Sequence, residues 1–162
     1  MKIRNASTQD LPAILTIVNH AIKTSTAVYD YHERSIAQIT AWYTKKLEDH
    51  LPILVAEENN TTIAYGSYGI FRPWDGFMHT VEHSIYVAEL HQKKGIGKLL
   101  LQALIEKAKQ QNFHCMVAGI DAENTKSILL HEKFGFEKTG HLKEVGRKFD
   151  RWLDLVFMQK IL

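Results

Sequence analysis

The segment that decides the fold is residues 84–100, SIYVAELHQKKGIGKLL. Its first residues predict a strand, and the apolar spacing after Gly97 predicts a helix, so a short basic turn joins the two. Backbone amides at the start of a helix have no partner within it, and the helix dipole favours an anion there. Glycines let this backbone approach a phosphate closely, and Lys93, Lys94 and Lys98 add positive charge. The turn is therefore a candidate site for a pyrophosphate.

Two familiar phosphate-binding patterns do not fit this turn. A dinucleotide-binding turn has the spacing G-x-G-x-x-G, but Leu100 stands where the third glycine would be. A P-loop needs G-x-x-x-x-G-K-[ST], and the chain has no such run. The remaining alternative is an ordinary strand–helix connection with solvated lysines.

Outward from this turn, the spacing of apolar residues predicts a mixed order of strands and helices. On the N-terminal side we expect strands at 2–4, 53–56, 62–71 and 81–87, a first helix capped by Thr8 or Asp10, and a second helix over 35–47. On the C-terminal side we expect helices at 97–111 and 125–134 and strands at 116–120, 136–142 and 153–158. This order predicts an α+β or α/β-type fold, in which one sheet carries helices on both faces.

Composition narrows the class of protein. The 162 residues are 45% hydrophobic and 23% charged, and no linker or repeat divides them, which predicts one domain over residues 1–162. The net charge of +2 gives no reason to expect a nucleic-acid or membrane partner. The only cysteine, Cys115, lies in an apolar run, so we expect a packed thiol and a cytoplasmic protein. The histidines show no metal-ligand spacing, and no metal is expected.

Several motifs resemble a known superfamily. Gln92-x-x-Gly95-x-Gly97 is similar to the acetyl-CoA pyrophosphate loop of GNAT acetyltransferases, and Asn124, Ser127 and HEKFGF (131–136) resemble their second signature. Longer stretches resemble the phosphinothricin and methionine sulfone/sulfoximine acetyltransferase group. These are TVEHSIYV (80–87), VAGIDAEN (117–124) and VGRKFDRWLD (145–154), with Asn19, His20, Ala21 and Trp42 near the start.

This resemblance implies a three-layer GNAT fold, with a mostly antiparallel sheet that splays to form an acetyl-CoA cleft. It implies acetyl transfer from acetyl-CoA to the α-amine of a small amino-acid-like acceptor, by direct attack within a ternary complex, and a homodimer. Phosphinothricin, methionine sulfone, methionine sulfoximine and L-amino acids are the acceptors to consider. The residues expected to bind the cofactor are Ile85, Tyr86, Val87, Ala88, Lys93, Lys94, Gly95, Ile96, Gly97, Lys98, Asn124, Ser127 and His131.

The resemblance also suggests chemical roles. Glu82 is the candidate general base, with His83 as the second candidate and a lysine or arginine partner for Glu82 as the structural alternative. The amide of Val87 is expected to bind the thioester oxygen. His131 stands where many relatives have a tyrosine that protonates the coenzyme A thiolate, and an imidazole suits this task because its pKa lies near neutrality.

Acceptor recognition is expected near Arg72, because a guanidinium can bind a carboxylate or phosphinate through two parallel hydrogen bonds. The residues expected to bind the acceptor are Tyr29, Arg72, Trp74, Asp75, Gly76, Phe77, Glu82 and His83. Lys93 and Asp150 each replace a glycine that is common in relatives. Acetylation of a protein N-terminus or lysine, and a non-catalytic acetyl-CoA-binding module, remain the alternative functions.

Overall fold

The computed structural model describes residues 1–162 and places these elements in a mixed order. The strands are β1 (Lys2–Asn5), β2 (Ile53–Glu58), β3 (Thr61–Ile70), β4 (Thr80–Val87), β5 (Cys115–Asp121), β6 (Glu137–Lys148) and β7 (Arg151–Ile161). The α-helices are α1 (Leu11–Thr24), α2 (Ile36–Glu48), α3 (Ile96–Gln110) and α4 (Thr125–Lys133). Short 3-10 turns are η1 (Thr8–Asp10), η2 (Asp75–Phe77) and η3 (Glu89–His91).

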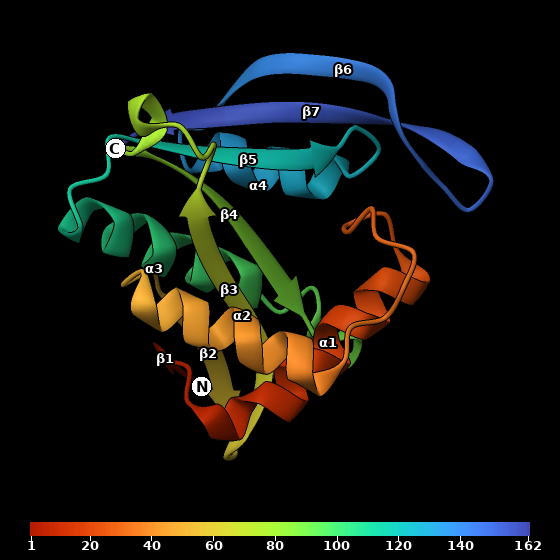
Figure 1. Ribbon diagram of the computed structural model, residues 1–162. Helices are drawn as coiled ribbons and strands as arrows, with labels where there is room; N and C mark the ends of the chain where they lie inside the picture. The colour runs from red at the N-terminus through yellow and green to blue at the C-terminus, as the bar shows by residue number, and fades with distance from the viewer.

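All seven strands form one sheet in the order β1-β2-β3-β4-β5-β7-β6. Neighbouring strands are antiparallel except β4 and β5, which are parallel. These two pair only from Thr80–Cys115 to Glu82–Val117. Beyond that point they diverge, and Figure 1 shows β5 turning away from the lower half of β4. The mostly antiparallel, splayed sheet predicted by the resemblance is confirmed.

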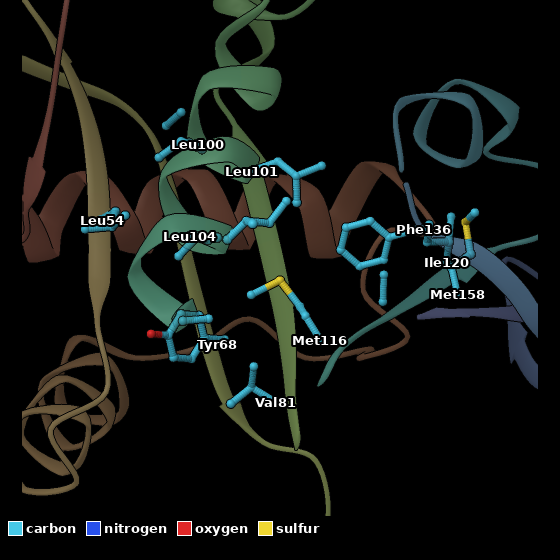
Figure 2. Close-up of a cluster of buried hydrophobic side chains, with 14 of the residues drawn as sticks. Leu54, Tyr68, Val81, Leu100, Leu101, Leu104, Met116, Ile120, Phe136 and Met158 are labelled. Atoms are coloured by element: carbon cyan, nitrogen blue, oxygen red, sulfur yellow. The ribbon is translucent and has the colours of Figure 1, made fainter. Parts of the chain in front are cut away.

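Helices cover both faces of the sheet, as the sequence predicts. On one face, α3 and α4 pack against β3, β4 and β5 through a core that includes Leu101, Leu104 and Met116 (Figure 2). On the other face, α1 and α2 pack against β2 and β3 through a smaller core that contains Ile14 and Ile39. None of the helices is long and apolar enough to cross a bilayer.

The last two strands are longer than the sequence predicts. They form a hairpin of 12 and 11 residues that extends past the rest of the sheet (Figure 1). The apolar pattern predicted strands only at 136–142 and 153–158. In β6 only the last residue, Lys148, is buried. Because the strand is solvated on both sides over most of its length, no apolar alternation marks it, and backbone pairing with β7 defines its extent.

Lys148 fastens the connection between α1 and α2 to this hairpin. Its Nζ donates hydrogen bonds to the carbonyl oxygens of Ser25 (2.7 Å) and Val28 (2.6 Å). Burial of the ammonium group lowers the pKa of Lys148. Nearby, the Tyr31 hydroxyl donates to the carbonyl oxygen of Arg147. The loop and the hairpin therefore form one wall beside the splayed strands.

We expect Leu104→Ala to lower the free energy of unfolding by about 2–5 kcal/mol, because it leaves a cavity where the side chain is fully buried between α3 and the sheet. Urea unfolding followed by circular dichroism measures this change. Leu99→Ala, at a 39% exposed position on the same helix, is the matched control. A loss below about 1 kcal/mol for Leu104→Ala would contradict the packing described for this core.

Candidate active site

A cleft of about 730 Å³ opens where β4 and β5 separate. Its walls come from β4, the turn before α3, the end of β5 and the start of α4. The lining residues are Ala27, Glu82–Val87, His91–Lys93, Gly95–Lys98, Ala118–Asp121, Asn124, Lys126, Ser127, Leu130 and His131. Of the residues expected to bind the cofactor, only Ala88 and Lys94 are not among them.

The backbone of β4 presents free amides to this cleft. Val87 lies opposite Ala64 in β3, and the bond from the Ala88 amide to the Ile63 carbonyl (2.9 Å) shows that this pair is not itself hydrogen-bonded. The amide of Val87 therefore points away from β3 and into the splay, and the amide of Ile85 does the same because strand alternation has a period of two. These donors can bind the carbonyl groups of an extended ligand.

The basic turn has the conformation that an anion site requires. Lys93 and Gly95 adopt left-handed backbone conformations, with φ of 62° and 81°. The left-handed value at Lys93 gives a physical reason for the glycine that is common there. Gly95 precedes the first residue of α3 and has no capping side chain, so the first-turn amides of α3 remain available to a phosphate.

Asn124 has two functions available to it. Its side-chain oxygen accepts a hydrogen bond from the Ser127 amide (3.1 Å) and so caps α4. The nitrogen of the same side chain makes no hydrogen bond within the protein and lies in the wall of the cleft. This nitrogen is the group that can donate to a pantetheine carbonyl.

Glu82 projects toward β5 on the face opposite α3 and α4. Its Oε1 lies 3.1 Å from the position that a Cβ would take at Gly119, so the missing side chain of Gly119 makes room for the carboxylate. Burial raises the pKa of Glu82 above its ordinary value, while the nearby Arg72 charge lowers it in part. The Arg72 guanidinium itself stacks on the Phe71 ring, 4.3 Å from its centre.

His83 and His131 form a buried pair. The Nε2 atoms of the two rings are 3.0 Å apart, and Nδ1 of His131 lies 2.7 Å from the Ser127 carbonyl oxygen. A carbonyl only accepts, so Nδ1 of His131 carries the proton and its Nε2 accepts the proton of His83. Burial lowers the pKa of both rings, to about 3 for His83. Both rings are therefore neutral at physiological pH.

The residues expected to bind the acceptor lie in three places, of which the first is the cleft itself, lined by Glu82 and His83. Arg72, Trp74, Asp75, Gly76 and Phe77 form the exposed connection between β3 and β4 and do not line the cleft. Tyr29 belongs to the connection between α1 and α2 and packs against the β6–β7 hairpin, where its hydroxyl donates a hydrogen bond to the Asp154 carbonyl oxygen (3.2 Å). Gly146 makes room for the Tyr29 ring, because a Cβ there would lie 2.6 Å from it. Burial, together with the charge of Asp121, raises the pKa of Tyr29 to about 12.

Sequence reasoning missed the wall formed by β5. Ala118, Gly119, Ile120 and Asp121 line the cleft, although only their resemblance to family motifs drew attention to them. The available signal was the parallel pairing of β4 with β5, because a strand that leaves its neighbour exposes its own edge. Cys115 begins this strand as a buried thiol, and burial raises its pKa.

Comparison with known proteins identifies the class. The Acetyltransferase (GNAT) domain family matches residues 3–157, so this chain belongs to the GNAT acetyltransferases. It is 47% identical, over 97% of its length and 92% of the relative, to the L-methionine sulfoximine/L-methionine sulfone acetyltransferase of Pseudomonas aeruginosa PAO1. It is 35% identical, over 99% of its length and 82% of the relative, to the phosphinothricin N-acetyltransferase of Alcaligenes faecalis.

Two solved structures share the fold throughout. A ribosomal-protein-alanine N-acetyltransferase from Brucella melitensis superposes with a TM-score of 0.99 at 46% identity, covering 100% of both chains. The yncA protein of Salmonella typhimurium, solved with its cofactor acetyl-CoA, superposes with a TM-score of 0.97 at 44% identity, covering 99% of this chain and 93% of the other. The chain is an acetyl-CoA-dependent acyltransferase, and its free β4 amides and glycine turn fit that cofactor. No three His, Cys, Asp or Glu side chains are grouped to hold a metal ion.

We expect Asn124→Asp to keep the cap on α4 but to weaken acetyl-CoA binding about tenfold, because it replaces the free amide donor with an acceptor. Isothermal titration calorimetry measures the dissociation constant, and thermal unfolding measures stability. Asn124→Ala, which removes both groups, should in addition lower the free energy of unfolding by about 1 kcal/mol. Unchanged affinity in both variants would contradict a role for Asn124 in cofactor binding.

Proposed function

We propose that this enzyme transfers the acetyl group of acetyl-CoA to the α-amine of a small amino-acid-like acceptor, by direct attack within a ternary complex. One observation carries the proposal: a half-buried carboxylate, Glu82, lies at the narrow end of the cofactor cleft, where the Arg72 charge acts on it. A carboxylate can take a proton from an amine, and a guanidinium can bind the carboxylate of an amino acid. The named relatives act on acceptors of this kind.

In this proposal, acetyl-CoA supplies a thioester carbonyl when it is bound. The amide of Val87 donates to the carbonyl oxygen and stabilises the negative charge that develops there. Glu82 takes a proton from the attacking amine, directly or through water. His83 is the weaker candidate for this step because its Nε2–H donates a hydrogen bond to His131. Its other ring nitrogen, Nδ1, is buried without a partner.

We also propose His131 as the acid that protonates the departing thiolate, with a condition that the geometry imposes. The neutral ring holds one proton, on Nδ1, and that proton is bound by the Ser127 carbonyl. Loss of this proton would leave an imidazole anion, so the ring must first gain a second proton to act as an acid. The nitrogen loses two protons when an ammonium group becomes an amide: Glu82 takes the first, and the second, released after the attack, is a suitable source.

The acceptor we propose is a zwitterion such as methionine sulfone, methionine sulfoximine, phosphinothricin or another L-amino acid. Arg72 receives its anionic group, and aromatic side chains from the same connection receive its side chain. Phe71 contacts Phe77 and Phe157, which makes one apolar cluster beside Arg72. Acetylation of a protein terminus or lysine has less support, because neither group presents a free α-carboxylate to Arg72.

A single domain, a homodimer and a cytoplasmic location complete the proposal. All strands join one sheet, which supports one domain over residues 1–162. The hairpin exposes several large apolar side chains, which supports association with a second copy. They are Leu142, Val145, Phe149 and Trp152. The one cysteine is a free thiol, as expected in a reducing compartment.

We expect purified enzyme to release coenzyme A thiol when acetyl-CoA is mixed with at least one of methionine sulfone, methionine sulfoximine, phosphinothricin or an L-amino acid. The assay is a thiol-reagent time course with mass detection of the N-acetyl product. Arg72→Ala should raise the acceptor KM at least tenfold and leave the acetyl-CoA KM unchanged, because it removes a charge-assisted bond to the acceptor. Cofactor binding without turnover on any acceptor would refute the proposed function.

We expect Glu82→Gln to lower kcat by about 10²–10⁴-fold, because it removes the general base without changing its shape. In the wild type, kcat/KM should fall as pH falls through the raised pKa of Glu82, since only the carboxylate accepts a proton. This fall of kcat/KM at low pH should be absent in Glu82→Gln and should move to higher pH in Arg72→Ala. Glu132→Gln, at an exposed site on α4, is the control. An unchanged profile in Glu82→Gln would exclude Glu82 as the base.

We expect Trp152→Glu to convert the dimer to monomers, because it places a charge on the apolar surface of the hairpin, where Trp152 is 61% exposed. Sedimentation velocity measures the oligomeric state. Leu129→Glu, at a 55% exposed site on α4, should leave the dimer intact. A wild-type protein that sediments as a monomer at micromolar concentration would refute the homodimer.

A further inference from the structure

The carboxylate of Asp121 is buried and only half satisfied. It ends β5, and the residue is 5% exposed. Its Oδ1 accepts a hydrogen bond from the Glu123 amide (2.8 Å), which shapes the turn into α4. Its Oδ2 is also buried and makes no hydrogen bond. Buried polar atoms without hydrogen bonds are rare in folded proteins, because each one costs free energy. We therefore expect this oxygen to bind a group that is not part of the chain.

The nearby cations of the chain are bound elsewhere. The Arg151 guanidinium is paired with Glu123 (2.6 Å). The Lys148 ammonium is bound to two carbonyl oxygens of the α1–α2 connection. The neighbouring Tyr29 hydroxyl donates to the Asp154 carbonyl oxygen. Oδ2 of Asp121 therefore makes no hydrogen bond within the chain, although the Tyr29 hydroxyl lies close to this carboxylate and the Arg151 charge acts on it.

Strand alternation puts Asp121 on the face of the sheet that carries Glu82. Gly119 points its missing side chain at the Glu82 carboxylate, and Asp121 lies two residues further along the same face, about 6.6 Å away. Asp121 lies four residues beyond Val117, the last residue of β5 that pairs with β4, and so on the part of β5 that has separated from β4. Asp121 also lines the cleft itself.

The chemistry of the partner follows from this position. Asp121 has no second and third ligand side chains with which to share a metal ion. A primary ammonium group offers a positive charge and several N–H donors, and charge-assisted bonds of this kind are the strong ones. Resting on the function proposed above, we propose that Oδ2 of Asp121 binds the ammonium group of the acceptor.

This assignment divides the recognition of the acceptor between two opposite charges. Arg72 takes the anionic group near the narrow end of the cleft, and Asp121 holds the nitrogen further along β5. When the ammonium gives one proton to Glu82, another N–H stays bonded to Asp121, and the nitrogen lone pair is free to face the acetyl carbon. No bond to Asp121 forms or breaks in the reaction, so Asp121 is a binding residue and not a base.

The test compares the binding of two ligands that differ only in the amine. L-Methionine sulfone and its desamino analogue, 4-(methylsulfonyl)butanoate, are titrated by calorimetry into the full-length enzyme saturated with coenzyme A. Asp121→Asn keeps the bond to the Glu123 amide and removes the charge. We expect it to weaken methionine sulfone at least tenfold and the analogue less than twofold. Glu123→Gln, which changes an exposed carboxylate two residues away, should alter neither.

Three results would overturn the proposal: equal weakening of both ligands, no weakening of either, or weaker binding of acetyl-CoA, which would assign Oδ2 to a pantetheine amide. If Asp121→Asn does not fold, the same titrations use Asp121→Ser, which also retains an acceptor for the Glu123 amide. These titrations measure binding of the acceptor, which does not depend on turnover. A wild type that binds methionine sulfone but acetylates no acceptor would refute the proposed function alone.

Discussion

The site depends on one feature of the backbone: β4 and β5 pair for three residues and then separate. Every N–H and C=O on the facing edges beyond Glu82 and Val117 loses its partner in the sheet, and such groups must be satisfied elsewhere. A ligand with amide and carbonyl groups along its length can restore part of that pairing. The cleft thus binds its cofactor with main-chain atoms that no substitution other than proline removes.

The splay also separates two kinds of chemistry by strand alternation. Odd-numbered residues of β4 from His83 to Val87 face α3 and α4, together with the histidine pair, whereas Glu82 faces the connection between α1 and α2. The cofactor and the acceptor can therefore approach from opposite faces of the sheet and meet at its gap. Gly119 is important here because a side chain on β5 would occupy the space of the Glu82 carboxylate.

Local patterns predicted most of the fold. The helices were predictable because each buries one face, and the central strands were predictable as short apolar runs, which are buried on both faces. The glycine turn was predictable because a left-handed residue and a helix start occur together. The length of the β6–β7 hairpin was not, because β6 buries almost nothing. The bond between His83 and His131 joins residues far apart in the chain, and no local period encodes such a contact. A local period also does not reveal that Oδ2 of Asp121 is buried without a hydrogen bond.

The paired histidines bear on the acid tolerance of the fold. Both imidazoles must be neutral in the folded chain, where burial lowers their pKa, whereas in the unfolded chain each takes up a proton near pH 6.5. The unfolded state therefore binds more protons as pH falls below about 6.5, and folding stability declines over that range. Because the pair joins β4 to α4, mild acid weakens a contact between two walls of the cofactor cleft.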